Sequence, residues 1–284
     1  IVFINKIFMN LEKQSYSAKL DKRSKYLRSL VLECLIGGDR GHMGSAMSLI
    51  EILRVLYDDI LNYYPKNPKN EDRDRLILSK GHGCLALYAI LADKGFFSKK
   101  ILKTSSKFNS ILGGHPEFDK VPGIEASTGA LGHGAPIGLG IALGARINKK
   151  KFNTFVIVGD GEINEGSFWE ASMIASKHKL ENFHIIIDYN KIQSYGKTKD
   201  VLDLEPLKQK LQSFGYEVDE INGHNISQLK TYFKKNKKSK KPSALICHTI
   251  KGKGFYFAEQ NPFWHHKNFF TDIEKKQLKE CIKN

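Results

Sequence analysis

Cysteine is scarce in this 284-residue chain, and its four cysteines are scattered along the sequence. They are Cys34, Cys84, Cys247 and Cys281. Their spacing is not that of metal ligands, which argues against a zinc site or a disulfide framework. We therefore expect reduced thiols and a cytoplasmic location.

Long hydrophobic runs are also lacking. No apolar stretch approaches the roughly 20 residues of a transmembrane helix. The first ten residues, "IVFINKIFMN", are apolar but have neither the basic region nor the small-residue cleavage site of a signal peptide. We expect residues 1–15 to form a tail or edge segment, and we expect no association with a membrane.

Acidic residues are too few to balance the basic ones, which leaves a net charge of +15. The densest basic block, "KKNKKSKKPS" (234–243), has no interleaved aromatic or arginine residues suited to reading bases. We interpret it as a solvated helix end and loop, and we expect no nucleic-acid partner. The charge is compatible with attraction of anionic substrates such as sugar phosphates. A nucleic-acid-binding or regulatory protein remains the alternative from another class.

Neither an internal repeat nor a flexible linker divides the chain. Short apolar segments alternate with glycine-containing turns and segments of helical period, which favours an α/β fold with a mostly parallel sheet and helices on both faces. We expect one such domain over residues 1–284. The expected strands are 75–79, 154–158, 183–188 and 243–250. Two helices, 21–36 and 45–61, are expected before them, with "GGDRGHMG" as the joint.

Oxygen-bearing side chains follow two successive strands. Asp160, between Gly159 and Gly161, ends the strand of "TFVIV", and Asn190 follows "FHIIID". A right-handed crossover brings both strand ends to one edge of the sheet, where ligands of open parallel sheets bind. Mg²⁺ uses few protein ligands and completes its octahedron with phosphate oxygens and water. The pattern therefore predicts a metal site that holds a diphosphate, and the flanking glycines permit its close approach.

The same residues form part of a larger set of motifs. "GDGEINEG" and its downstream "YN" occur together with "GHMGSAMS", "LSKGHGCLALYAIL", "GGHPE" and "STGALGHG". In this order they resemble the amino-terminal half of the transketolase family, which binds thiamine diphosphate. The resemblance extends from the first helix to "WHHK".

The resemblance implies a role for each matching residue. The side chains of Asp160 and Asn190 and the carbonyl of Ile192 would bind Mg²⁺, for which Ca²⁺ or Mn²⁺ can substitute. The positions that match cofactor-binding ones are Ser45, His82, Gly129, Ala130, Leu131, Gly161, Asn190 and Lys251. His42 and His265 match proton-transfer positions at the donor hydroxyls, and His115 matches a substrate-orienting one. Glu165 matches a glutamate near the partner subunit that couples the two cofactors.

Two positions depart from the family pattern. His266 stands where glycine usually follows the histidine matched by His265, which affects the expected substrate fit. His133 stands where many full-length members have glutamine, although "LGHG" resembles the split, two-subunit members.

The family's second, pyrimidine-binding domain has no counterpart in this sequence. The resemblance therefore implies the N-terminal subunit of a split transketolase, completed by a C-terminal partner subunit, with α2β2 as the expected assembly. Its reaction would transfer a two-carbon ketol unit from a ketose to an aldose, which are sugars or sugar phosphates. Two alternatives stay open. One is a specialised relative making an unusual sugar or glycan precursor. The other is a different thiamine enzyme, similar to deoxyxylulose-phosphate synthase or to a 2-oxoacid dehydrogenase α-subunit.

Overall fold

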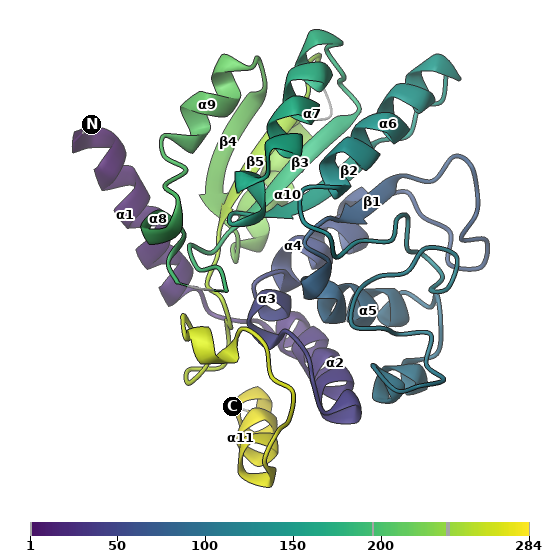
Figure 1. Cartoon of the computed structure of the whole chain (residues 1–284), viewed down its shortest axis with the longest axis vertical. Helices are drawn as coiled ribbons and strands as arrows, with labels where there is room; N and C mark the ends of the chain where they lie inside the picture. The colour runs from purple at the N-terminus through teal and green to yellow at the C-terminus, as the bar shows by residue number, and fades with distance from the viewer. Residues whose placement is uncertain (1, 195, 237–238, 284) are drawn as a thin grey trace.

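A parallel β-sheet forms the centre of the protein (Figure 1). The structure, a computed structural model, describes residues 2–194, 196–236 and 239–283. Within them, five parallel strands follow the order β1-β2-β3-β5-β4. The strands are β1 (Arg75–Leu78), β2 (Thr154–Gly159), β3 (Phe183–Tyr189), β4 (Glu217–Asn222) and β5 (Ser243–His248). The predicted parallel sheet is confirmed.

The central strands are buried on both faces, which explains their continuous apolar sequences. Every residue of β2, β3 and β5 is buried. Alternate side chains of a strand point to opposite faces, so Phe155 and Ile157 join one hydrophobic cluster while Val156 and Val158 join the other. Helices and loops supply the remainder of each cluster, and helices cover both faces of the sheet as expected.

The first cluster contains residues of α2, α3, α4, α5 and α10, and the second contains residues of α6, α7 and α9. The helices are α1 (Val2–Ser17), α2 (Lys22–Gly38), α3 (Met43–Met47), α4 (Ile50–Val55), α5 (Cys84–Asp93), α6 (Gly134–Ile147), α7 (Gly166–Lys177), α8 (Thr198–Val201), α9 (Leu207–Ser213), α10 (Ile226–Asn236) and α11 (Asp272–Lys283). A π-helical turn (Leu56–Ile60) continues α4. Among the described helices, none is long and apolar enough to cross a membrane.

The two helical segments expected before β1 are present, but the second is interrupted. Asp21 caps α2 by accepting a hydrogen bond from the amide of Ser24 at 2.8 Å. Asp39, with φ of 53°, ends α2 in the left-handed region, where the chain turns into the glycine-rich joint. The predicted segment 45–61 is divided at residues 48 and 49 into α3 and α4.

Two elements of the structure were not predicted. Residues 2–15, expected to be a tail or edge segment, belong to helix α1, which contacts β4 and β5. Strand β4 was not expected, because its sequence "EVDEIN" is rich in acids and only partly buried, as suits a strand at the edge of a sheet. The lysine-rich block begins in the last turn of α10, and its residues 237 and 238 lie outside the described residues.

A buried ionic network joins the first helices to the far end of the chain. Arg28 in α2 forms two hydrogen bonds to Glu51 in α4, at 2.6 and 3.0 Å, and donates to the carbonyl oxygen of Lys253 at 2.9 Å. His224 Nδ1 lies 2.8 Å from Glu51 Oε2, and His224 Nε2 accepts a hydrogen bond from the amide of Ile250 at 2.9 Å. Both Arg28 and Glu51 are almost completely buried. The network therefore fixes the loop after β5 against the helical layer.

Candidate active site

The two oxygen-bearing side chains at the strand ends lie next to each other in the sheet. β2 pairs with β3 in a register that places Gly159 opposite Asp188. Asp160 accepts hydrogen bonds from the amide of Gly161, at 2.8 Å, and from the amide of Lys191. Asn190 Oδ1 accepts one from the amide of Ile192 at 3.1 Å. The expected adjacency of the two strand ends is confirmed.

A cavity of about 240 Å³ opens at this edge of the sheet. Its lining contains 12 of the 14 site residues that the sequence predicted. They are His42, Ser45, His82, His115, Gly129, Leu131, Asp160, Gly161, Asn190, Ile192, Lys251 and His265. Ala130 lines an adjoining hollow together with His115 and His133, and Glu165 is exposed at the start of α7. Segments from all parts of the chain thus meet at one place.

The histidine rings gather over this cavity from four separate loops. The ring centroid of His42 lies 5.4 Å from those of His82 and His265 and 6.2 Å from that of His115. Burial, and then the neighbouring His266, lowers the pKa of His42 to about 3. Burial beside Lys251 lowers the pKa of His265 to about 3 as well. Both imidazoles are therefore neutral at pH 7 and able to accept a proton from a hydroxyl group.

One of the two positions that depart from the family pattern, His266, contacts this histidine group directly. The ring of His266 lies 4.3 Å from that of His42. A glycine here would leave that side of His42 open. His266 therefore narrows the space in which a substrate could approach His42.

Two ionic residues of the site were not predicted. Lys80, which follows β1, forms a fully buried ion pair with Asp188 at the end of β3. Asp188 also accepts hydrogen bonds from the hydroxyls of Ser48, at 2.6 Å, and Thr249. Although burial opposes ionisation of Asp188, Lys80 keeps its pKa below the ordinary value. A permanent negative charge consequently lies beside Asp160.

The charges at the strand ends suit a bound cation. Burial, reinforced by Asp188, raises the pKa of Asp160 to about 6. The positive charge near this carboxylate is therefore too small to compensate for its burial. Lys80 is paired with Asp188, and the ammonium of Lys251 donates instead to the carbonyl oxygen of Ile192 at 2.7 Å. Among the described residues, no group of three or more His, Cys, Asp or Glu side chains is arranged to hold a metal. A cation here would rely on Asp160, the neighbouring amide and carbonyl oxygens, and ligands from outside the chain, as Mg²⁺ commonly does.

The cavity also fits a polar ligand that approaches the backbone closely. Ser45 Oγ and His265 Nδ1 are buried without a hydrogen-bond partner, although both residues line the cavity. Gly129 has φ of +145°, and a Cβ there would lie 3.0 Å from the ring of His115. A Cβ on Gly161 would lie 2.9 Å from that of Gln193. Unsatisfied polar atoms and glycine-lined walls together suit a diphosphate-bearing cofactor.

Glu162 is a further residue that the sequence analysis missed. Its buried carboxylate accepts hydrogen bonds from the amides of Gly132 and Gly159, both at 3.0 Å. It thereby joins the loop before α6 to the end of β2. The acid follows Asp160 by two positions in "GDGEINEG", but its sequence alone does not indicate which loop it contacts.

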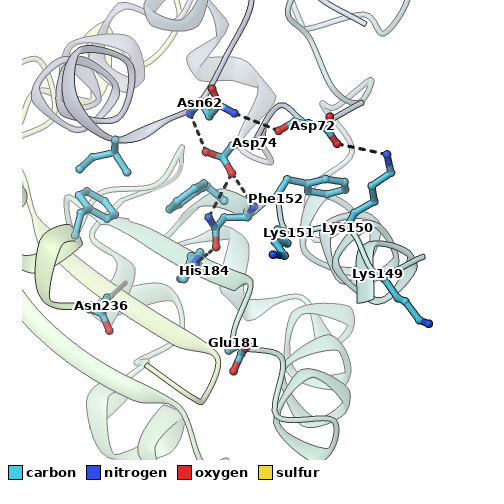
Figure 2. A pocket seen from close by; sticks show the side chains of 14 residues that line it. Asn62, Asp72, Asp74, Lys149, Lys150, Lys151, Phe152, Glu181, His184 and Asn236 are labelled. Atoms are coloured by element: carbon cyan, nitrogen blue, oxygen red, sulfur yellow. Dashed lines mark hydrogen bonds and ion pairs between the residues drawn. The ribbon is translucent and has the colours of Figure 1, made fainter. Parts of the chain in front are cut away.

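A larger cavity, of about 820 Å³, lies at the opposite edge of the sheet (Figure 2). Its lining includes residues that precede strands, such as Asp74 before β1 and Asn153 before β2. Asp74 accepts hydrogen bonds from the amides of Asn62, at 2.8 Å, and Asn153, at 2.7 Å. None of the predicted site residues lines this cavity. The candidate site is therefore identified by its lining residues and by its position at the carboxyl ends of the strands, and not by the volume of its cavity.

Residues 20–280 match the family model described as transketolase, thiamine diphosphate binding domain. The chain belongs to the transketolase family. The expected assignment to these thiamine diphosphate-dependent transferases is thus confirmed, together with the thiamine diphosphate-binding domain. Helix α1 precedes the matched region.

Two relatives within the transketolase family are similar to this chain over most of their length. An apulose-4-phosphate transketolase subunit from Phocaeicola vulgatus is 42% identical over 248 residues, which cover 87% of this chain and 88% of that protein. The 6-deoxy-6-sulfo-D-fructose transketolase subunit SqwG from Clostridium sp. (strain MSTE9) is 37% identical over 265 residues, 93% of this chain and 96% of that protein.

Solved transketolases share the fold. The transketolase from Campylobacter jejuni superposes with a TM-score of 0.85 at 32% identity, covering 92% of this chain and 42% of that one. The Pichia stipitis transketolase, whose complex with sedoheptulose 7-phosphate has been solved, gives a TM-score of 0.86 at 29% identity and covers 92% of this chain and 40% of that one. This chain therefore spans about two fifths of the solved transketolases that it matches.

The buried His184, which lines the larger cavity, should make the free energy of unfolding depend on pH. Burial lowers its pKa to about 4, whereas an unfolded histidine titrates near 6.5. Above pH 6.5 neither state binds the proton; below it the unfolded state gains a proton that the folded state excludes. We expect this residue alone to lower the free energy of unfolding by about 2 kcal/mol between pH 7 and pH 5. Denaturant unfolding at pH 7 and pH 5 should show a smaller loss of the free energy of unfolding in His184→Gln than in the wild type. Equal losses in the two proteins would contradict the lowered pKa of His184.

Proposed function

We propose that this chain is the thiamine diphosphate-binding subunit of a split transketolase, which transfers a two-carbon ketol unit from a ketose donor to an aldose acceptor. The observation that carries the proposal is the meeting of the strand-end residues Asp160 and Asn190 with the loop histidines around one cavity. Membership of the transketolase family supports the same reaction.

Asp160, Asn190 and the carbonyl oxygen of Ile192 would hold Mg²⁺, for which Ca²⁺ or Mn²⁺ can substitute, and the metal would hold the diphosphate. Lys251 would then exchange its hydrogen bond with Ile192 for one with the cofactor. The other proposed cofactor contacts are Ser45, His82, Gly129, Ala130, Leu131 and Gly161. Thiamine diphosphate supplies the electron sink for cleavage and formation of the carbon–carbon bond.

The protein's contribution to the chemistry is to orient the sugar and to move its protons. His42 and His265 are neutral and adjacent, so either can accept the proton of a donor hydroxyl and return it later. The exposed His115 stands at the mouth of the cavity and would orient the substrate. Glu165, also exposed, would face the partner chain, where it would couple the two sites of the assembly.

A partner subunit carrying the pyrimidine-binding domain would complete the site. One observation supports this proposal: the relatives matched over most of their length are named as subunits. We infer an α2β2 assembly. A cytoplasmic location is also part of the proposal, supported by four free cysteine thiols.

The names of two relatives bear on which sugar this chain uses. The two relatives described above are named for two different and uncommon sugars, apulose 4-phosphate and 6-deoxy-6-sulfo-D-fructose. His266 narrows the approach to His42. These observations favour a specialised sugar or sugar phosphate as the substrate of this chain.

Calorimetric titration and reconstitution test the proposal together. We expect the chain to bind thiamine diphosphate only when Mg²⁺ is present, with tighter binding after addition of a pyrimidine-binding subunit encoded beside it. Ketol transfer should require both chains. Binding that is indifferent to Mg²⁺, or ketol transfer by this chain alone, would contradict the metal assignment or the split architecture, respectively.

A further inference from the structure

Helix α1 is attached to the carboxyl ends of the strands, where the candidate site lies, although the helix is outside the region matched by the family model. Figure 1 shows it alongside β4, with which it is in contact. Ser15 Oγ donates a hydrogen bond to the carbonyl oxygen of His248, at 2.8 Å, at the end of β5. Lys253, in the loop after β5, donates to the carbonyl oxygen of Tyr16 at 2.6 Å. The last turn of α1 is thus fixed to β5 and its following loop.

A third contact attaches α1 to the residues 190–194, which we call the metal loop. Glu12 Oε2 lies 2.7 Å from Lys191 Nζ. Lys191 stands between Asn190 and Ile192, two of the proposed metal ligands, and its amide donates to the carboxylate of Asp160, the third. A single residue of the metal loop therefore connects α1 to the proposed ligands.

Lys191 also has a backbone conformation that an L-residue adopts only at a cost. Its φ is +66°, in the left-handed region that favours glycine. Its carbonyl oxygen accepts a hydrogen bond from the amide of Thr198 at 2.9 Å, which helps to hold this conformation. Such strain persists where surrounding contacts enforce it. Since Glu12 fixes the Lys191 side chain, it is one of the contacts that do so.

We propose that α1 acts as a clamp that preorganises the metal loop for its cation, through the Glu12–Lys191 ion pair. This inference rests on the proposed function, because it takes Asp160, Asn190 and Ile192 as the metal site. Glu12 and Lys191 are positioning residues and do not touch the metal. Without the ion pair, the loop would sample other conformations and would have to be ordered when the cation binds, which weakens binding.

The expected effect is moderate because the ion pair is partly exposed. The side chains of Lys191 and Glu12 are 28% and 39% exposed. Partly exposed pairs make small contributions, so we expect Glu12→Gln or Lys191→Gln to weaken Mg²⁺ binding by about 2- to 5-fold. The double variant should be no weaker than either single variant, because both changes break the same contact.

Calorimetry of Mg²⁺ at saturating thiamine diphosphate tests the clamp on the whole chain. Glu71→Gln is the matched control: it removes the same charge from an exposed ion pair with Lys150, 3.0 Å long, beside the opposite edge of the sheet. It should leave the Mg²⁺ affinity unchanged. Amide hydrogen exchange of the metal loop without metal gives an independent readout, and we expect faster exchange in Glu12→Gln than in the control.

The outcomes separate the clamp from the proposed function. Weaker, non-additive Mg²⁺ binding together with faster exchange of the metal loop would support the clamp. A Mg²⁺ affinity that is unchanged in Glu12→Gln, Lys191→Gln and the double variant would overturn the clamp alone. So would losses of affinity in the two single variants that add up in the double variant. A wild-type chain with no Mg²⁺-dependent binding of thiamine diphosphate would overturn the proposed function and the clamp with it.

Discussion

Replacement of Asp160 by asparagine is expected to abolish Mg²⁺-dependent binding of thiamine diphosphate, with a loss of affinity of about 100-fold or more. Changes to groups that only orient metal ligands already cost about 10- to 100-fold. A proposed direct ligand that provides the anionic oxygen should cost at least the upper end of that range. Calorimetry with and without Mg²⁺ measures the effect.

The same substitution is expected to stabilise the protein without metal. The pKa of Asp160 is raised to about 6 by burial and by Asp188, so at pH 7 its charge is less favourable in the folded state than in the unfolded one. Removing that charge should increase the free energy of unfolding by about 1–2 kcal/mol. Asparagine retains an oxygen that can accept from the amide of Lys191, as Asp160 does. Asp160→Ala lacks this acceptor and should lower stability, which makes it the contrasting variant.

A metal site and a merely structural turn would respond differently to these variants. If Asp160 only stabilised the turn, Asp160→Asn would keep cofactor affinity, and its main effect would be on unfolding. Retained Mg²⁺-dependent affinity in Asp160→Asn would therefore contradict the assignment. Increased stability combined with lost affinity would instead show that the buried carboxylate is retained for binding at a cost to the fold.

Breaking the buried network at Glu51 is expected to produce the largest loss of stability. Glu51→Gln would leave the guanidinium of Arg28, which is 1% exposed, without a counter-charge. Removal of one partner of a buried pair costs about 3–5 kcal/mol. The exposed pair of Lys120 and Glu117 provides the control, because Glu117→Gln should change the free energy of unfolding by less than about 0.5 kcal/mol. Denaturant unfolding at pH 7 compares the two.

A double variant distinguishes an unpaired charge from lost packing. Arg28→Met with Glu51→Leu replaces both charges by apolar side chains of similar size, and it should recover a substantial part of the stability lost in Glu51→Gln. A double variant that is less stable than Glu51→Gln would indicate that the hydrogen bonds from Arg28 to backbone carbonyls dominate. One such bond is that from Arg28 to Lys253, at 2.9 Å.

The strands that could be predicted from sequence are those whose burial dictates their composition. Each segment expected to be a strand overlaps one of β1, β2, β3 and β5. β4 has only one neighbour, β5, and its partly exposed acidic residues give it a sequence that resembles a polar loop. Helix α1 was not predicted for a related reason: its position depends on tertiary contacts such as that of Ser15 with His248, which the local sequence of the first residues does not reveal.

The candidate site divides in a similar way. Asp160 and Asn190 could be brought together from sequence because their strands are consecutive and adjacent. Lys80 and Asp188 could not, since β1 and β3 are separated by β2 in the sheet. The long side chain of Lys80 spans that gap over Gly159, where a Cβ would lie 3.7 Å from its Cδ. Contacts of this reach depend on a three-dimensional arrangement that spacing along the chain does not encode.

The strand order has a consequence for how copies of this chain can associate. An exposed strand at the edge of a sheet can recruit a strand from another molecule and so seed intermolecular sheets or fibres. Here one edge strand, β1, has only four residues, and the other, β4, carries Glu217, Asp219 and Glu220 and is contacted by α1. Short length and acidic side chains both discourage such recruitment. Any stable assembly should therefore join through helices and loops, leaving each copy's sheet separate.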